Sequence, residues 1–391
     1  MIKFSIAGLY RPRIIFLVFL LIAIVVGLQE YYLGKYNNFV IFRSSYQHLL
    51  DFKNLYRPFL DEYGDIFLYS PTFAFLMAPW AYIPMLPDLL IWTAFNSLAV
   101  YFAVVLLPKA TKTEKMTIFL ILIFEFITSL QNTQTSPFLV SCMVFAFISF
   151  ERKNVFWAAF WIILATYIKV YALAAAILFI LYPQKPKFIL SMFFWGVLLL
   201  FLPLIAIPAK QLWVQYHNWF NQMAYIHQDE ETGLRPNIAI PLSVMGWLKT
   251  WFNFRPPSVY IQGLGVAMLC LPYLRFKKYG NIRFRYFMLS SVLIFCMIFN
   301  HIAESPSYVI AVFGLAIWFA FEDKNLVSIS LFVFAFIFTI LIATDFFPAN
   351  IRHQYAVPYV WKAVPCIVIW FYLQARLLFG KLETAGFCLV D

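Results

Sequence analysis

Charge is scarce in this chain of 391 residues. Asp, Glu, Lys and Arg together make up 12%, against about 25% in soluble domains. Hydrophobic residues make up 63%, and 46 residues are phenylalanine. A surface so poor in charge suits acyl chains rather than water. The composition therefore predicts an integral membrane protein and excludes an ordinary soluble globular domain.

Metal-ligand, disulfide and nucleotide motifs are also missing. Four of the five cysteines sit in apolar runs, Cys388 sits in the tail, and no pair has metal-ligand spacing. The chain has no GxxxxGK[ST] or GxGxxG motif, so we expect no soluble nucleotide-binding domain. We see no internal repeat. The expectation is a protein without a cofactor or a metal.

The net charge of +11 raises the question of nucleic acid. The positive residues are scattered in short loops between apolar runs, which is how a membrane protein orients itself. We therefore expect membrane lipids, and not nucleic acid, as surroundings.

The apolar runs predict one all-α polytopic domain over residues 1–391, with about 12 transmembrane helices of roughly 20 residues each. The first run lacks a cleavage site and is expected to be a retained anchor. The stretch 154–183 is either two short helices or one broken helix. The predicted spans are 14–33, 88–108, 116–131, 136–151, 154–168, 170–183, 187–208, 258–274, 286–301, 307–322, 326–345 and 359–379.

The segment 70–84 decides the topology. It holds three prolines in 15 residues, which predicts an interfacial or re-entrant helix rather than a span. If it crossed, the basic stretch RFKKYGNIRFR would face outward, against the positive-inside rule. We therefore predict an inner (plasma) membrane protein with both termini cytoplasmic. Two long loops, 34–87 and 209–257, then face outward, and the active site faces outward with them.

Polar residues at the outward end are the candidate functional groups. In the first loop, Asp65 directly precedes the aromatic-Pro entry to 70–84, close to the membrane surface. Lys169 stands inside an apolar run and needs a counter-charge or an anionic ligand. Glu125, within a span, is either a cavity group or the partner of Lys169. The amides of SLQNTQTSP suit either sugar hydroxyls or helix capping.

Two later segments add charge at the same end. NHIAESPSY places His301 and Glu304 three residues apart, which on a helix would put them on one face. The segment from Asp345 to Lys362 supplies cations that suit either phosphate or an interfacial belt. No third ligand follows His301 and Glu304 at zinc spacing.

Taken in order, these segments resemble glycosyltransferase family 87, whose members use polyprenyl-phosphate sugars, include α-1,2-mannosyltransferases and have the class C membrane glycosyltransferase fold. NNFVIFRSSYQHLLDFKNLY is similar to the family's opening loop and FLYSPTFAFLMAPWAYIP to its Tyr-Pro-Pro segment. SLQNTQTSPFLV stands where the family has Gly-Gln-x-Asn, ATYIKVYAL resembles its Lys-x-x-Pro element, and HIAESPSYVI its late Ser-Pro turn.

The resemblance implies transfer of a mannose-like sugar from a polyprenyl-phosphate donor to a glycolipid or glycan acceptor, with inversion and without a metal. The chain departs from the family where its expected catalytic base, a first-loop Asp, is replaced by Asn38; Leu130 replaces a Gly, and Tyr171 and Ala172 stand near the usual Pro. We expect the catalytic base at Asp65, with Glu62 and Glu304 as substitutes. The expected donor-phosphate ligands are Lys169, His301, Arg352 and Lys362. The expected sugar ligands are Asn38, Gln131, Asn132 and Gln134.

Two other classes stay open. A catalytically inactive protein that binds lipid phosphate or glycan is favoured by Asn38. A lipid or solute transporter would place polar groups near mid-membrane on repeated halves, which this sequence does not show.

Overall fold

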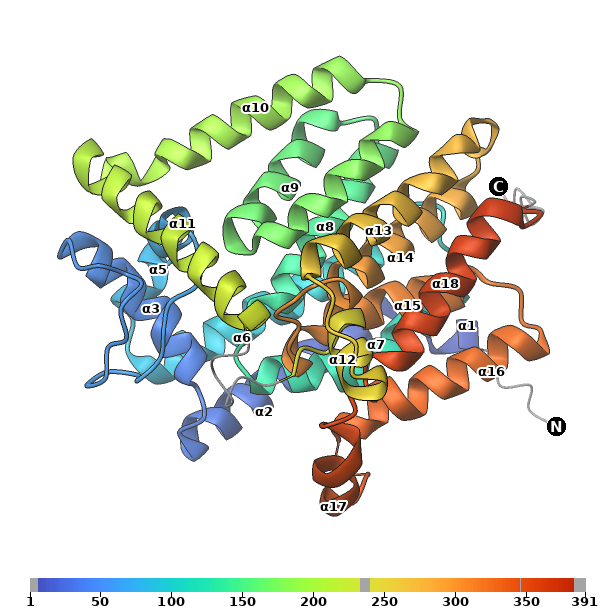
Figure 1. Ribbon diagram of the computed structural model, residues 1–391, viewed down its shortest axis with the longest axis horizontal. Helices are drawn as coiled ribbons and strands as arrows, with labels where there is room; N and C mark the ends of the chain where they lie inside the picture. The colour runs from blue at the N-terminus through green and yellow to red at the C-terminus, as the bar shows by residue number, and fades with distance from the viewer. Residues whose placement is uncertain (1–5, 233–239, 345, 383–391) are drawn as a thin grey trace.

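The computed structural model describes residues 6–232, 240–344 and 346–382, and these residues form helices with no strand (Figure 1). The first half of the chain contains α1 (Ile6–Leu9), α2 (Pro12–Leu33), α3 (Asn37–Leu50), α4 (Pro71–Leu76), α5 (Ala78–Ala81), α6 (Met85–Val105), α7 (Lys112–Gln131), α8 (Ser136–Glu151), α9 (Val155–Ile168), the 3₁₀ helix η1 (Val170–Leu181), α10 (Lys185–Phe201) and η2 (Leu202–Ile205). The second half contains α11 (Ala209–Thr232), α12 (Val244–Phe252), α13 (Ser258–Cys270), η3 (Leu271–Leu274), η4 (Phe276–Lys278), α14 (Ile282–Ile298), η5 (Ser305–Tyr308), α15 (Val309–Phe321), α16 (Leu326–Ala335), η6 (Phe336–Ile340), η7 (Leu341–Ala343), α17 (Ala349–Ile351), η8 (Arg352–Ala356) and α18 (Val364–Phe379).

Every predicted span overlaps a helix or a run of consecutive helices. Three helical segments, Pro12–Leu33, Met85–Val105 and Lys185–Ile205, are long and apolar enough to cross a membrane. Seven shorter apolar helices accompany them among the described residues. The all-helical fold of the described residues is therefore confirmed and is consistent with a membrane protein, and the number of twelve crossings stays a prediction.

Two predicted spans start four or five residues away from the helix start, for different reasons. The span expected at 286–301 is α14, which begins at Ile282: Asn281 caps it by accepting hydrogen bonds from the Arg283 and Phe284 amides, at 2.8 and 3.2 Å. The arginines after this cap are polar, so the apolar run alone does not reveal the first turn of the helix. The span expected from 359 begins only at Val364, because Val360 has a positive φ of 49° that interrupts the helix.

The stretch 154–183, for which the sequence allowed two short helices or one broken helix, forms two helices separated at one residue. α9 ends at Ile168, Lys169 is extended (φ −140°, ψ 120°), and η1 begins at Val170. A 3₁₀ helix of 12 residues is unusually long for this conformation. The break releases backbone groups from the helical ladder, a situation tolerated at membrane depth only where protein or a wet cavity surrounds it.

The core lies where α14 and α15 pack against each other. Gly314 of α15 makes this contact possible, because a Cβ at this position would meet the Ser290 carbonyl oxygen at 2.8 Å. Ser290 Oγ in turn donates to the Gly314 carbonyl oxygen at 2.7 Å. Small residues at such contacts let membrane helices approach closely. By contrast, the outer helices α2 and α10 expose large apolar side chains such as Leu21 (60%) and Phe193 (70%), which suits lipid.

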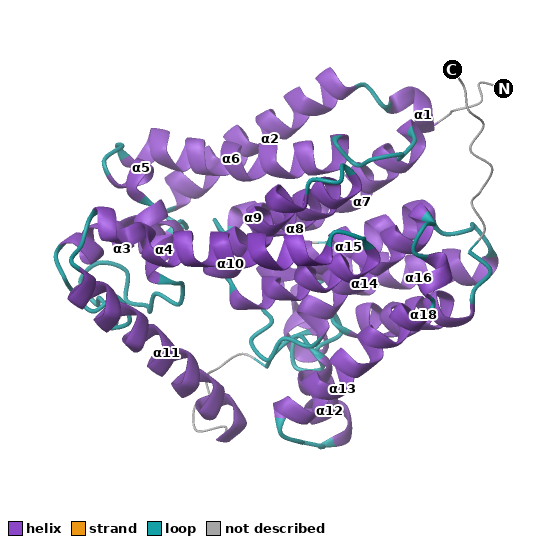
Figure 2. Cartoon of the chain, turned by 90° about the horizontal axis from the view of Figure 1, so that it is seen from above, coloured by secondary structure: helices purple, strands orange, loops and turns teal. Residues whose placement is uncertain are grey.

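Ion pairs gather at one end of the bundle. Arg285 binds Glu151 through two bonds of 2.5 and 2.9 Å, and Arg376 binds Glu322 at 2.7 Å. The segments joined here are ones predicted to face the cytoplasm. α1 and the end of α18 lie at this same end in both views (Figures 1 and 2). The side of the membrane that it faces stays a prediction.

The first loop and α11 build the opposite end (Figure 2). The segment 70–84 forms only α4, of six residues, and α5, of four, far below the roughly 20 that a span needs. Both of its ends return to α3: Tyr69 packs on Phe42 with ring centroids 4.9 Å apart, and Arg43 donates to the Ile83 carbonyl at 2.6 Å. This return supports the re-entrant prediction.

Helix α11 lies across the first loop and occupies much of the predicted second outer loop. Gln215 donates to the Lys53 carbonyl at 2.7 Å, and the Tyr216 hydroxyl meets the Thr72 hydroxyl at 2.7 Å. The other face of α11 exposes Trp213 (73%) and Phe220 (65%), a pattern that suits a membrane interface.

The Gly314 contact gives a first prediction. Gly314→Ala inserts a methyl group against the Ser290 carbonyl, and overpacking of this kind costs about 1–3 kcal/mol. We expect a lower midpoint of thermal unfolding in detergent. The matched control is Gly263→Ala in α13, where a Cβ has no neighbour within 4 Å. Equal midpoints for the two variants would contradict the close packing of α14 on α15.

Candidate active site

Four segments far apart in the sequence meet around Lys169. Its Nζ donates to Ser307 Oγ at 3.4 Å, and Ser136 Oγ bonds the same hydroxyl at 3.2 Å. The Lys169 ammonium lies 5.8 Å from the ring centroid of Tyr69, in cation–π range. The turn before α8, the break after α9, the turn before α15 and the entry to α4 therefore share one site.

The Lys169 ammonium is enclosed by protein but not fully engaged. The residue keeps accessible surface, and Glu304 is the carboxylate that acts on it electrostatically. An ammonium carries three N–H donors. Within the described residues, Lys169 makes a single long hydrogen bond, so it retains capacity for an anionic ligand.

Lys362 is engaged on every side. Its Nζ donates to Glu125 Oε1 at 2.7 Å, to Ser305 Oγ at 2.8 Å and to the Ser305 carbonyl at 3.2 Å. The residue is only 4% exposed. Lys362 and Lys169 thus touch the same turn from two sides, through Ser305 and Ser307.

The alternative that Glu125 pairs with Lys169 is wrong. Glu125 is fully buried and forms its ion pair with Lys362, which is 237 positions later in the chain. Glu304 is instead the carboxylate that acts electrostatically on Lys169. Both lysines are cations in apolar surroundings, so the sequence gives no basis for choosing which of them pairs with Glu125. The choice depends on how α7 packs against the turn before α15.

His301 and Glu304 do not share a helical face, contrary to the spacing argument. α14 ends at Ile298, and the next helix, η5, begins at Ser305. Asn300 Oδ1 accepts from the Ile302 amide at 3.1 Å, a turn that competes with helix continuation. His301 instead lies beside Gln262 of α13, with Nδ1 3.4 Å from its amide nitrogen, while Glu304 acts electrostatically on Lys169.

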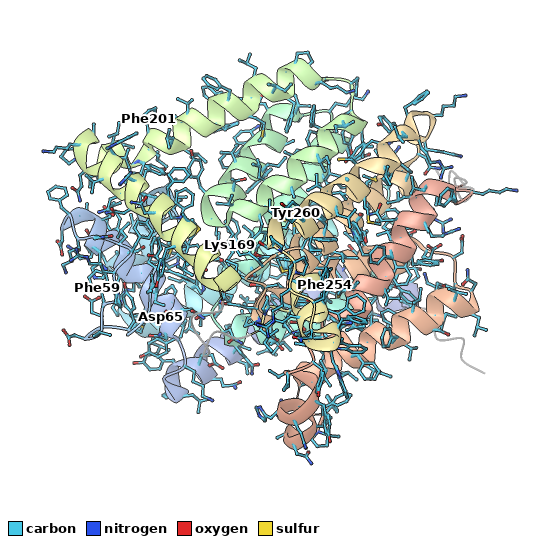
Figure 3. All side chains as sticks on the ribbon, viewed as in Figure 1. Phe59, Asp65, Lys169, Phe201, Phe254 and Tyr260 are labelled. Atoms are coloured by element: carbon cyan, nitrogen blue, oxygen red, sulfur yellow. The ribbon has the colours of Figure 1, made fainter. Side chains whose placement is uncertain are left out.

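The first-loop carboxylates differ in availability. Glu62 lies 3.0 Å from Nε2 of the buried His48, so it is already engaged. Asp65 is exposed, and its Oδ1 accepts only from the adjacent Ile66 amide, at 2.7 Å, among the described residues. Burial, with a smaller contribution from Glu62 and Asp65, raises the pKa of Tyr63, so this phenol stays neutral beside them. In Figure 3, Asp65 lies toward the first-loop side and Lys169 nearer the centre of the view.

Asn38 joins the first loop to the turn that carries Gln131, Asn132 and Gln134, here called the amide turn. Its Nδ2 donates to the Asn132 carbonyl at 2.9 Å, while the neighbouring Asn37 donates to the Tyr63 carbonyl at 3.1 Å. An ionised carboxylate at position 38 would have no proton for this bond. The side chain at the family's expected base position therefore serves here as a donor.

The amide turn contains one buried side-chain amide whose oxygen has no hydrogen-bond partner among the described residues. The Asn132 side chain already donates to the Thr128 carbonyl at 2.9 Å, and Gln131 is half-buried at the end of α7. Gln134 is 6% exposed, and its Oε1 has no hydrogen-bond partner within the described residues. Buried polar atoms normally have partners, so a ligand or water is the natural complement.

Two hydroxyl groups in this turn were not among the residues predicted from the sequence. The buried Thr133 and Thr135 hydroxyl oxygens also lack a partner meeting hydrogen-bond geometry among the described residues, although Thr135 neighbours the Tyr69 hydroxyl. Burial raises the pKa of Tyr69, so its phenol stays protonated. The one sequence signal was the density of Ser and Thr around the amides, which also fits capping.

Arg352 and Asp345 are the candidates from the segment that follows η7. Arg352 begins η8 directly after α17, which projects from the bundle in Figure 1. Asp345 lies outside the described residues.

Backbone strain marks the site at two positions. Thr133 (φ 48°) and Val360 (φ 49°) are β-branched residues in the left-handed region, where such residues are rare. Thr133 lies in the amide turn, and Val360 lies two residues before Lys362. Strain of this kind persists only where surrounding structure imposes it, and it is concentrated at functional sites.

The cluster formed by Lys169 and the amide turn can bind an anion and hydroxyl groups. It offers one cation with free donors, several buried oxygen atoms without partners, and the carboxylate of Glu304 as an electrostatic neighbour of the cation. The described residues contain no group of three metal-ligating side chains.

One comparison with known protein families gives a match. The family model for glycosyltransferase family 87 matches residues 67–299, a range that contains the amide turn and Lys169. Neither a curated protein nor a solved structure gives a match. Since the match covers more than half of the chain, this protein belongs to glycosyltransferase family 87.

Proposed function

We propose that the protein transfers a mannose-like sugar from a polyprenyl-phosphate donor to a glycolipid or glycan acceptor at the outer face of the membrane. The observation that carries the proposal is Lys169, an enclosed ammonium with uncommitted donors beside the unpaired Gln134 turn. A sugar phosphate offers both an anion and hydroxyls. A lipid-borne donor also explains why the sequence has no soluble nucleotide-sugar domain.

The reaction breaks the bond between the anomeric carbon and a phosphate oxygen. The polyprenyl phosphate leaves with the bonding electrons, and Lys169 stabilises the charge that develops on it. The acceptor oxygen forms the new bond to the anomeric carbon from the opposite face and gives its proton to a carboxylate. The buried oxygens of Gln134 and its neighbours hold the sugar hydroxyls. No step requires a metal.

Asp65 is the first choice for the base. In an inverting reaction the base and the leaving group lie on opposite faces of the sugar, as in inverting glycosidases. Glu304 is the carboxylate that acts electrostatically on Lys169, so we assign it to the phosphate side. Asp65 follows Tyr63, whose carbonyl is tied to the first turn of α3, and Asn38 ties that same turn to the sugar-binding side. Glu62 is engaged by His48.

The inactive-protein alternative loses part of its support. It would be favoured if no carboxylate lay near the cations of the site, yet Glu304 acts on Lys169. A transporter is disfavoured because the sequence shows no two related halves.

The carboxylates are tested by transfer assays in nanodiscs, with radiolabelled polyprenyl-phosphate sugars and membrane glycolipid acceptors. Loss of a general base lowers rates by about 10²–10⁴-fold, and we expect Asp65→Asn to fall in that range. Glu304→Gln should cost less, about tenfold, because it removes a neighbour of Lys169 rather than the base. EDTA should leave the rate of the unsubstituted protein unchanged.

Asp61→Asn is the matched control, since Asp61 is an exposed carboxylate four residues from Asp65. Full activity in well-folded Asp65→Asn, Glu62→Gln and Glu304→Gln variants would rule out all three as the base. Absence of transfer from every donor, together with binding of the lipid phosphate, would favour the inactive binding protein.

Asn38 gives a separate prediction. Asn38→Asp exchanges a donor for a charge that faces the Asn132 carbonyl, and losing a hydrogen bond of this kind costs about 1 kcal/mol. We expect a lower unfolding midpoint and no gain in transfer. Asn350→Asp is the control, because Asn350 uses Oδ1 as an acceptor from the Ile351 amide, which Asp can also do. A stable Asn38→Asp variant with raised activity would show that position 38 is the base position.

A further inference from the structure

Lys362 differs from Lys169 in how its donors are used. Three acceptors surround its ammonium within 3.2 Å, and they match its three N–H groups. A phosphate could bind only by displacing Glu125 or Ser305. Displacing Glu125 would leave a buried carboxylate without its partner, which is strongly unfavourable.

The Glu125 carboxylate fixes the ammonium from the helix side. Glu125 is fully buried on α7, one turn before Ser129 and two turns before the amide turn. Its position is therefore set by the same helix that carries the sugar-binding amides. Through its ion pair, Glu125 fixes the position of Lys362, which lies in the segment between η8 and α18.

Ser305 is the third member of this arrangement. Lys362 binds both its carbonyl and its hydroxyl, so the residue is held at two points. Ser305 directly follows Glu304 and lies two residues before Ser307, the hydroxyl that contacts Lys169. Whatever holds Ser305 therefore sets where Glu304 and Ser307 stand relative to the Lys169 ammonium.

The segment carrying Lys362 is itself constrained. Thr339 Oγ1 donates to the Lys362 carbonyl at 2.9 Å. Val360, two residues earlier, is fully buried with a positive φ. A strained β-branched residue next to a saturated lysine indicates that the surrounding packing imposes the lysine's position.

We infer that Lys362 is a positioning residue and not a donor-phosphate ligand. With Glu125, it holds the turn 304–307 against Lys169, so that the phosphate-binding ammonium and Glu304 keep one geometry. This role departs from the sequence-based prediction that Lys362 binds phosphate, and it rests on the proposed function.

The test compares Lys362→Met, Glu125→Gln and the double variant Glu125→Leu/Lys362→Met with Lys169→Met. Lys115→Met is the control, because Lys115 is a partly buried lysine at the other end of α7 that binds only the Val105 carbonyl among the described residues. Binding of farnesyl phosphate, a probe without a sugar, is measured in nanodiscs, together with kcat and donor KM for transfer.

We expect Lys169→Met to weaken probe binding about tenfold or more, as befits loss of a charge-assisted bond to phosphate. Lys362→Met and Glu125→Gln should leave probe binding within about threefold, yet lower kcat by up to about 10²-fold through misplacement. The double variant should regain thermal stability, because no unpaired charge stays buried, without regaining kcat. Probe binding weakened as much in Lys362→Met as in Lys169→Met would overturn the inference, as would full kcat in the double variant.

A labelling experiment separates this inference from the proposed function. Glu304→Cys is introduced with Cys270→Ser and Cys388→Ser, and its alkylation rate by a polar maleimide is measured with Lys362 present or replaced by Met. We expect faster alkylation with Lys362→Met and no change with Lys115→Met. If the unsubstituted protein neither binds the probe nor transfers sugar, the proposed function fails. An unchanged alkylation rate then overturns the positioning role, and a raised rate upholds it.

Discussion

Breaks in apolar helices are the constraint on which this site depends. A regular helix in hydrocarbon satisfies its own backbone and leaves no polar group for a substrate, so a binding site must be built where helices stop. Three such interruptions contribute to the site: Lys169 between α9 and η1, the turn at Thr133, and the turn at Val360. Each carries a polar side chain of the site or lies within two residues of one. The interruptions cost stability, and the close packing of α14 on α15 supplies the rigid support that offsets them.

The two lysines of the site illustrate how burial alone misleads. Both are cations in apolar surroundings, and both would be assigned to an anionic ligand by charge. The Lys362 donors are matched by Glu125 and Ser305, whereas Lys169 has one long bond to a hydroxyl. A cation that is already satisfied holds structure, and a cation with spare donors can bind substrate. The number of N–H donors that already have acceptors therefore distinguishes the two lysines, whereas their charge does not.

The helices followed from the sequence because the apolar runs are long and their ends carry recognisable caps and prolines. Even the break at Lys169 was visible, since a charged residue interrupts an apolar run. The partners were not, because they depend on contacts between distant segments: Glu125 meets a lysine 237 positions away rather than the nearer Lys169. Helical spacing also failed for His301 and Glu304, where an Asn turn ends the periodicity. Sequence reasoning proposed candidate residues and could not find which of them touch.

The extent of the family match has a physical counterpart in the site. Residues 67–299 contain the amide turn and Lys169, the groups suited to the sugar and the phosphate. Asp65 and Asn38 lie before this range, and Glu304 and Lys362 lie after it. Glu125 lies within this range and pairs with Lys362 outside it, so a segment beyond the match folds back onto the part that the family shares. The first loop does the same from the other side of the range, because Asn38 joins it to the amide turn and Gln215 of α11 binds its Lys53 carbonyl. The site proposed for this protein is therefore completed by segments on both sides of the matched range.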